Sequence, residues 1–401
     1  MVAVTGLGVV SPHGDDAETM FAALMRGESA IGPVFPELSK PAAAARVAFD
    51  PARWFTRLQL SGVDRVSQLA VAAAELAWAD AGGPTDLPPH RLGVYVGCGM
   101  GGAAALETAY AAGARNGRTP PLTVPAFMPN APAAHIAMRR NARGPVLTYS
   151  VACASSAVAL AEAAKAVQRG DVDLAIAGGS EAPIVPGVMT AWQAMMTLAN
   201  LADGQAATAC RPFSVDRSGF VLAEGAAFMV LESRASARAR GVHVHAELAG
   251  WGLSCDATHL TAPSADGQAR AMQAALAMAG LQPQDLGYCN AHGTATRAGD
   301  RVESQALRSV WGARLADLRV SSTKALHGHL LGAAGALEAA VTVLALREQR
   351  LPPNAHCTMA DPDCGLPLVL EPNTSARDLL AATSNSFAFG GTNAVLAFRR
   401  A

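Results

Sequence analysis

The chain has 401 residues, of which 51% are hydrophobic and 16% are charged, and its formal net charge is -1. This composition predicts a compact chain with ample core, in one large domain or two fused ones. A balance so close to neutral, without a run of Lys or Arg, argues against a nucleic acid or an anionic membrane as the main partner.

Seven cysteines are scattered along the chain without a C-x-x-C pair: Cys98, Cys153, Cys210, Cys255, Cys289, Cys357 and Cys364. This odd number and spacing fit neither a disulfide framework nor a zinc site, and predict a reducing, cytoplasmic environment and no bound metal. The N-terminus, M-V-A-V-T-G-L-G, lacks a basic segment and is typical of a first strand rather than a signal. The apolar run 330–346 is interrupted by Glu338, so we expect no membrane span.

The first part of the chain alternates expected strands and helices. In order they are a strand over 2–7, a helix over 16–26 capped by Asp15 or Asp16, an Ala-rich helix over 68–81, and a strand over 92–96 before the glycine-rich loop 97–102. The stretch 120–132 carries five prolines, and we expect an irregular loop over a pocket or subunit boundary. A strand over 174–177 and a hairpin-like pair near Phe220 and 228–231 follow.

Between the proline-containing stretch 120–132 and the expected strand over 174–177 lies T-Y-S-V-A-C-A-S-S-A-V-A-L-A-E-A-A-K (148–165). This pattern predicts a strand, a tight turn and a helix, with Cys153 at the turn. A thiol at a helix start feels the positive end of the helix dipole, so we expect its thiolate to be favoured near neutral pH. A buried structural cysteine is an equal alternative on this stretch alone.

The pattern then recurs. A helix over 268–279, a strand over 286–289 and the loop N-A-H-G repeat the order of 68–97, and a strand over 318–323 leads into a helix over 332–346. We therefore predict a duplicated α/β fold, with halves 1–240 and 241–401 and a site at their junction. One long doubly wound sheet is the alternative.

Three later loops carry candidate chemistry. Y-C-N-A-H-G-T-A-T (288–296) places His292 among small residues, where it can reach a ligand or remain an ordinary loop histidine. V-S-S-T-K-A-L-H-G-H-L-L-G-A-A-G-A-L-E (320–338) supplies Lys324, His327 and His329. Its Glu338 lies on an apolar helix and needs a Lys or His partner. S-N-S-F-A-F-G-G-T-N-A (384–394) is either an ordinary turn or one that brings backbone N–H groups to a ligand.

A thiol nucleophile with two neutral histidines limits the reaction class. Cysteine proteases need one histidine and a group that orients it, whereas two imidazole N–H donors converging on one point suit an enolate oxyanion. The set Cys153, His292 and His329 therefore favours carbon–carbon bond formation.

At these residues, and in T-G-L-G-V-V-S-P, R-P-F-S-V-D-R-S-G-F-V-L-A-E-G-A and F-G-G-T-N, the sequence resembles the chain-elongating β-ketoacyl-acyl carrier protein synthases of the thiolase superfamily. The resemblance implies two similar βαβαβαββ halves layered α-β-α-β-α. It implies decarboxylative Claisen condensation with malonyl-acyl carrier protein, in fatty-acid or type II polyketide-like synthesis. No cofactor is implied beyond the phosphopantetheine of the acyl carrier protein, and the partner is a second copy or a related subunit.

The resemblance also implies residue roles. Cys153 would take the acyl chain as a thioester, and His292 and His329 would bind the malonyl thioester carbonyl and its enolate. Lys324 and Glu338 would hold this network. The remaining implied roles are an oxyanion hole from the N–H groups of Cys153 and Phe389, gating by Phe389, and substrate binding by Thr294, Thr296, Leu106, Phe387, Gly390 and Gly391. Leu106 would help close an acyl channel that the small residues Ala103, Ala104 and Ala105 leave roomy; those alanines could equally be packing residues.

The sequence departs from the family pattern at Ala388 (commonly Gly), His327 (commonly Thr) and Arg297 (commonly Pro). His327 is not the catalytic histidine, because in the family that residue lies five positions after the lysine, which is His329 here. A non-catalytic chain-length-setting subunit is one alternative, but such subunits lack the nucleophile. A thiolase is another, but it uses a second, C-terminal cysteine that the loop 384–394 lacks.

Overall fold

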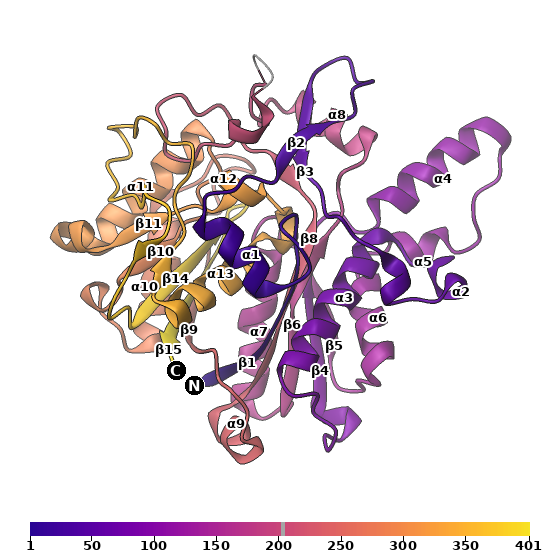
Figure 1. The fold of residues 1–401 in the computed structure, drawn as a ribbon, viewed down its shortest axis with the longest axis horizontal. Helices are drawn as coiled ribbons and strands as arrows, with labels where there is room; N and C mark the ends of the chain where they lie inside the picture. Colours follow the sequence, from indigo (N-terminus) through magenta and orange to yellow (C-terminus); the bar gives the residue numbers. More distant parts are fainter. Residues whose placement is uncertain (202–204) are drawn as a thin grey trace.

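The computed structural model describes residues 1–201 and 205–401. A ten-stranded sheet runs through the molecule in the order β11-β10-β14-β15-β9-β1-β8-β6-β4-β5 (Figure 1). Its strands are β1 (Val2–Val10), β4 (Leu92–Gly97), β5 (Val146–Tyr149), β6 (Leu174–Glu181), β8 (Gly225–Ser233), β9 (Ala246–Cys255), β10 (Tyr288–Asn290), β11 (Arg319–Ser321), β14 (Ala381–Phe387) and β15 (Thr392–Arg400).

The two halves of the sheet repeat the same arrangement of parallel and antiparallel strands from each edge to the centre. In one half β5, β4 and β6 are parallel and β8 and β1 antiparallel; in the other β11, β10 and β14 are parallel and β15 and β9 antiparallel. The halves meet where β1 pairs antiparallel with β9. This mirrored order confirms the predicted duplication and excludes one doubly wound sheet. The division at residues 240 and 241 stays a prediction.

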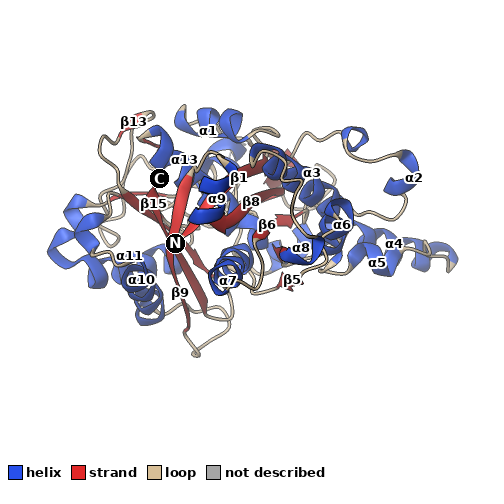
Figure 2. Cartoon of the chain, turned by 90° about the horizontal axis from the view of Figure 1, so that it is seen from below, coloured by secondary structure: helices blue, strands red, loops and turns tan. Residues whose placement is uncertain are grey.

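Six helices complete the two βαβαβαββ units: α3 (Arg65–Asp80), α6 (Ala131–Arg140) and α7 (Ser155–Arg169), then α10 (Ala265–Ala279), α11 (Arg297–Trp311) and α13 (Ala334–Glu348). Helices α7 and α13 pack against each other and against strands of both halves. Helices α3 and α6 pack on strands of the first half, and α10 packs on β9 and β15 of the second (Figure 2). This is the predicted α-β-α-β-α layering.

The same glycine pair in each half lets a helix lie directly on a strand. A Cβ on Gly8 of β1 would lie 2.0 Å from the carbonyl oxygen of Ala73 in α3. One on Gly252 of β9 would lie 1.9 Å from that of Ala271 in α10. Such distances exclude any side chain, so G-L-G in β1 and G-W-G in β9 are the sequence trace of one repeated packing contact.

The smaller elements surround this framework. They are α1 (Ala17–Met25), α2 (Arg57–Leu60), α4 (Ala103–Asn116), α5 (Thr123–Phe127), α8 (Pro186–Ala194), α9 (Arg234–Arg240), α12 (Lys324–His327), a sheet of β2 (Ile31–Val34), β3 (Ala42–Ala45) and β7 (Leu222–Ala223), and the pair β12 (Arg350–Leu351) and β13 (Thr374–Ser375). Asp16 caps α1 as predicted, with its carboxylate accepting from the N–H of Thr19 at 2.7 Å.

Two expectations are wrong. Residues 120–132 are not one irregular loop: they hold α5 and the start of α6, because Pro125 and Pro132 lie in first turns, where a missing N–H costs no hydrogen bond. The segments near Phe220 and 228–231 form no hairpin. Strand β7 belongs to the small sheet, while β8 lies between β1 and β6 in the large one.

All seven cysteines are free. In the described part of the chain, no helix has the length and apolar character that crossing a membrane would need.

Candidate active site

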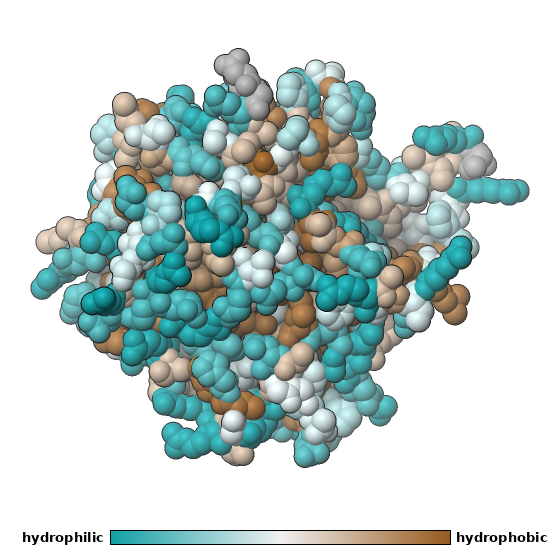
Figure 3. All heavy atoms as spheres, in the orientation of Figure 1, coloured by the Kyte–Doolittle hydropathy of each residue, from teal (hydrophilic) through white to brown (hydrophobic). Residues whose placement is uncertain are grey.

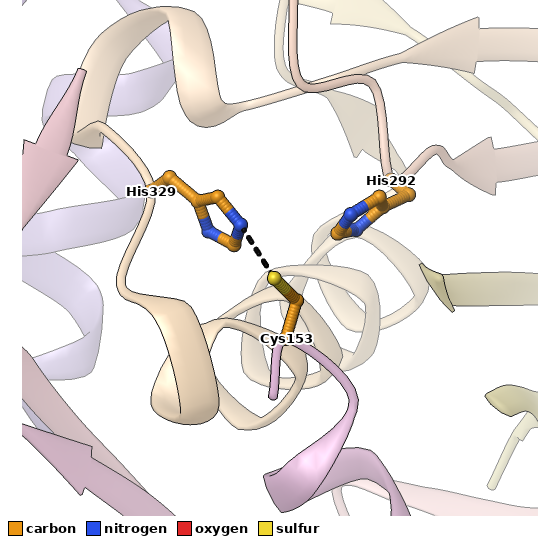
Figure 4. Close-up of side chains that lie close together, drawn as sticks. All are labelled: Cys153, His292 and His329. Atoms are coloured by element: carbon orange, nitrogen blue, oxygen red, sulfur yellow. Dashed lines mark hydrogen bonds between the residues drawn. The ribbon is translucent and has the colours of Figure 1, made fainter. Parts of the chain in front are cut away.

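Three loops meet at one point because of the duplicated fold. Cys153 lies just before the central helix α7, and His329 lies just before its counterpart α13. His292 follows β10. The cysteine sulfur and one nitrogen of each imidazole lie within 4.8 Å of one another, and both rings point at the sulfur (Figure 4). Such a set could also hold a metal ion, which would block the nucleophile; the expectation of no metal stays a prediction.

The turn at Cys153 is closed by its own neighbours. Ala152 has a left-handed φ of 47°. Ser155 accepts from the N–H of Val151 at 2.9 Å and donates to the carbonyl of Ala152 at 2.6 Å. The hydroxyl thus replaces backbone bonds that a helix start lacks. This fixes the direction of the Cys153 side chain.

The tautomer of His329 follows from its hydrogen bonds. The N–H of Leu331 donates to His329 Nδ1 at 3.2 Å, so the ring proton is on Nε2. That Nε2–H faces Cys153 Sγ at 3.1 Å. The phenyl edge of Phe220 packs on the same ring, with 5.2 Å between centroids.

His292 presents its proton in the same way. Lys324 Nζ lies 3.4 Å from His292 Nδ1 and donates to the His292 carbonyl at 2.7 Å. An ammonium group only donates, so Nδ1 accepts and Nε2 carries the proton. The N–H groups of His292 and Gly293 are held by the carboxylate of Glu303 at 2.9 and 2.8 Å.

The predicted partner of Glu338 is Lys324, and the two form a fully buried ion pair. Burial raises the pKa of Glu338, and the Lys324 ammonium acts in the opposite direction. Burial also lowers the pKa values of His292 and His329 well below their usual range, and the positive charge of Lys324 lowers them further. Both rings are therefore neutral N–H donors at working pH.

The thiolate expectation is wrong for this state of the site. Burial raises the pKa of Cys153 to about 12, although Lys324 and the backbone N–H groups of Phe389 and Cys153 favour the thiolate. Helix α7 begins at Ser155, so Cys153 precedes its first turn. Desolvation by the covering loops outweighs the helix dipole.

A cavity of about 230 Å³ opens beside the sulfur, and Thr294, Thr296, Phe387, Phe389 and Gly391 are among its lining residues. The two threonine hydroxyls lie 3.0 Å apart. Phe387 packs edge-on against the His292 ring. Residues predicted to bind or gate the substrate thus line the cavity, and their individual roles stay predictions.

Two predicted residues lie elsewhere. Gly390 is exposed and is not among the lining residues, with φ 88° and its N–H donating to the Leu260 carbonyl at 2.7 Å. Leu106 lies on α4, where Ala104 and Ala105 line a separate groove with Leu60 and Leu122. The described cavity at Cys153 does not reach the alanines, so their part in an acyl channel also stays a prediction.

The cavity is also lined by residues that the sequence did not predict for the site, among them Trp192, Phe220 and Glu303. Trp192 stacks on Phe389 with centroids 6.2 Å apart and meets Phe220 edge-on at 5.4 Å. Its helix α8 gave no motif, whereas Phe220 stands in S-G-F-V-L-A-E-G-A and could have been singled out there. Contacts between aromatic rings thus connect Phe389, in the loop 384–394, to His329.

Family models match both parts of the chain. The one described as "Beta-ketoacyl synthase, N-terminal domain" matches residues 1–237, and "Beta-ketoacyl synthase, C-terminal domain" matches residues 245–358. Nodulation protein E of Rhizobium sp. (strain N33) is 43% identical over 406 residues, covering 100% of this chain and 99% of the relative. The 3-oxoacyl-[acyl-carrier-protein] synthase 2 of Staphylococcus aureus (strain N315) is 38% identical over 409 residues, covering 100% and 98%.

Solved structures agree. A β-ketoacyl synthase from Burkholderia phymatum STM815 matches with a TM-score of 0.92 at 34% identity, and one described as "The ishigamide ketosynthase/chain length factor" with 0.91 at 35%; each comparison covers 100% of this chain and 99% of the other. A type II PKS acyl-carrier protein in complex with its ketosynthase gives 0.90 at 29%, with the same coverage. These matches confirm the resemblance and the fold class predicted from the sequence.

The buried thiol makes a prediction about alkylation. Because the pKa of Cys153 is about 12, its alkylation rate by iodoacetamide should keep rising with pH from 7 to 10 without a plateau. Mass spectrometry of the digested protein follows this rate, with the exposed Cys255 as an internal check on the reagent. A plateau between pH 7 and 8 would show that the thiolate already predominates there.

Proposed function

Because the chain belongs to the β-ketoacyl synthase family, we propose that it condenses an acyl group held on Cys153 with malonyl-acyl carrier protein, releasing CO₂ and β-ketoacyl-acyl carrier protein. The observation that carries this proposal is one thiol facing two neutral imidazole Nε2–H groups beside a cavity of about 230 Å³. A non-catalytic partner subunit is disfavoured, because the nucleophile and both donors are present.

The first step is acyl transfer. Cys153 sulfur attacks the thioester carbonyl of an acyl-acyl carrier protein, and its proton leaves with the phosphopantetheine thiol. The N–H groups of Cys153 and Phe389, which face the sulfur, are proposed to hold the oxyanion. Since burial keeps the free thiol protonated, the reaction must remove this proton as the carbon–sulfur bond forms.

The second step is decarboxylative condensation. The malonyl thioester loses CO₂, the enolate carbon attacks the acyl-enzyme carbonyl, and the Cys153 thiolate leaves and takes up a proton. As CO₂ leaves, negative charge develops on the malonyl thioester oxygen. The Nε2–H groups of His292 and His329 are the proposed donors to this oxygen. Burial and the charge of Lys324 keep both rings neutral, and Lys324 and the N–H of Leu331 orient His292 and His329 respectively, so no proton needs to move to them.

The acyl carrier protein is the proposed source of both substrates, and its phosphopantetheine arm is the only prosthetic group that the proposed reaction uses. Thr294 and Thr296 at the cavity are the proposed contacts for that arm. One structural relative is itself a complex of a ketosynthase with its carrier protein. Incubation with a panel of acyl-carrier proteins, followed by identification of the acyl groups that remain on Cys153, tests whether the product enters fatty-acid or polyketide-like synthesis. A cytoplasmic location stays a prediction.

A dimer through β5 is the proposed assembly. β5 pairs with β4 and ends the sheet, and its Val146 and Leu147 are 37% and 45% exposed. An apolar, unpaired edge strand is a template for pairing with another chain. Helices α4 and α5 project from the same half of the molecule (Figure 1), and hydrophobic residues (brown) lie among hydrophilic ones on that side of the face drawn in Figure 3. The edge strand of the other half, β11, is covered at Val320 and Ser321.

The histidine roles are tested by separating two rates. His292→Ala and His329→Ala should each lower malonyl decarboxylation about 10²–10³-fold, the usual effect of losing one oxyanion donor, and lower acylation of Cys153 far less. Cys153→Gln, which mimics the acylated thiol, should block acylation and retain decarboxylation. Mass spectrometry of enzyme and carrier protein reads both rates. Wild-type decarboxylation in both histidine variants would refute the mechanism.

The edge strand is tested by light scattering. A wild-type mass of two chains should fall to one in Leu147→Lys, because a buried lysine would be unpaired at the interface. Leu380→Lys, at a residue 62% exposed on another surface, is the matched control and should stay dimeric. A wild-type mass of one chain would contradict the homodimer and favour pairing with a related subunit. A dimeric Leu147→Lys would exclude β5 as the contact.

A further inference from the structure

The His327 imidazole, which the mechanism does not use, is fully buried and lies between Lys324 and His329 in the sequence. It ends α12, three residues after Lys324 and two before His329, and its exposed fraction is 0%. Its Nδ1 lies 2.7 Å from the carbonyl oxygen of Gly328, and its Nε2 lies 2.9 Å from Thr323 Oγ1. Both ring nitrogens therefore have a partner inside the protein.

These partners fix the tautomer of His327. A carbonyl oxygen only accepts, so Nδ1 carries the proton and donates to Gly328. Nε2 is then the acceptor from the Thr323 hydroxyl. Burial lowers the pKa of His327 to about 3, so the ring stays neutral and this arrangement holds throughout the working pH range. His327 is thus a fixed donor rather than a proton carrier.

The hydrogen bond from His327 holds the carbonyl oxygen of the peptide group that joins Gly328 to His329. The N–H of His329 donates to the Val221 carbonyl at 2.7 Å, so this peptide plane is held on both sides. Gly328 has φ 71° and ψ −174°, a conformation that favours glycine, and a Cβ there would lie 2.9 Å from that of Ala223. Glycine adds no side-chain packing of its own, so the hydrogen bonds must set the plane.

The orientation of that plane decides where the His329 Nε2–H points. The His329 ring follows its backbone and is set against Leu331 N–H and Cys153 Sγ at 3.2 and 3.1 Å. Rotation of the Gly328–His329 peptide would take its oxygen away from His327, its one donor in the described part of the chain. The same rotation would shift the His329 ring. A shift of 1 Å in a catalytic group can cost about 10²-fold in rate.

We propose that His327 is a positioning residue, which holds the Gly328–His329 peptide so that the His329 Nε2–H faces the reacting atoms. The inference rests on the proposed function for its effect on decarboxylation. Threonine, common at this position in the family, is too short to reach Gly328 and Thr323 with two different atoms. His327 is therefore a feature of this chain's own site.

Two amide variants separate the two bonds of the ring. In His327→Asn the amide nitrogen takes the place of Nδ1 and can still donate to Gly328; in His327→Gln the amide reaches the place of Nε2 and serves only Thr323. In a Cys153→Gln background, malonyl-acyl carrier protein plus a proton gives acetyl-acyl carrier protein and CO₂, which isolates the histidine chemistry. The Gln variant should lose about tenfold in kcat with KM nearly unchanged, and the Asn variant should stay within about threefold of its parent.

Alkylation of Cys153 by iodoacetamide gives a second readout that needs no carrier protein. With the cysteine present, His327→Gln should alkylate more slowly than His327→Asn, because a displaced His329 Nε2–H stabilises the thiolate less. His327→Thr should behave like the Gln variant, and provides the test if the Gln variant does not fold. Thermal unfolding shows which variants are folded.

Equal kcat and alkylation rates in the Asn and Gln variants would overturn the positioning role, whether both match the parent or both fall. A protein that alkylates on Cys153 but never decarboxylates malonyl-acyl carrier protein would overturn the proposed function. In that case the alkylation rates alone would decide the role of His327.

Discussion

The buried ammonium group of Lys324 is the constraint on which the site depends. It pairs with Glu338, donates to the His292 carbonyl and faces His292 Nδ1, all without access to water. A charge buried this deeply is costly unless it is paired and hydrogen-bonded. Its position therefore fixes His292, and its charge adds to burial, the larger cause of the lowered pKa values of both imidazoles. The N–H of Leu331 sets the tautomer of His329, so Lys324 contributes to this pair of N–H donors without taking part in bond making.

The duplicated fold is what brings these groups together. Each half places a helix start at the centre of the molecule, and the two starts carry different chemistry: Cys153 before α7 and His329 before α13. The glycine contacts of Gly8 and Gly252 with their helices show that both halves keep the same geometry although their sequences have diverged. The site arises at the pseudosymmetric junction because neither half holds both the proposed nucleophile and the proposed enolate donors.

The sequence predicts the parts of this account that local pattern determines. Alternating strands and helices predict the duplicated fold, the three loops predict Cys153, His292 and His329, and an isolated carboxylate on an apolar helix predicts a partner for Glu338. Properties of a residue that depend on segments distant from it in the sequence could not be predicted from local pattern. The raised pKa of Cys153 comes from the loops that bury it, Trp192 stands in a helix without a motif, and His327 gains its role only from the bend at Gly328. The five prolines in 120–132 led to the wrong prediction of an irregular loop. The position of a proline within a helix, rather than the number of prolines, decides whether the helix is broken.

The central claim is that His292 and His329 are neutral and carry their protons on Nε2. The most direct test is ¹⁵N NMR of the protein labelled at histidine, with the two signals assigned by His292→Ala and His329→Ala. Between pH 6 and 9, each ring should show a protonated Nε2 and an unprotonated Nδ1. A proton on Nδ1 of either ring, or a doubly protonated ring in this range, would contradict the account.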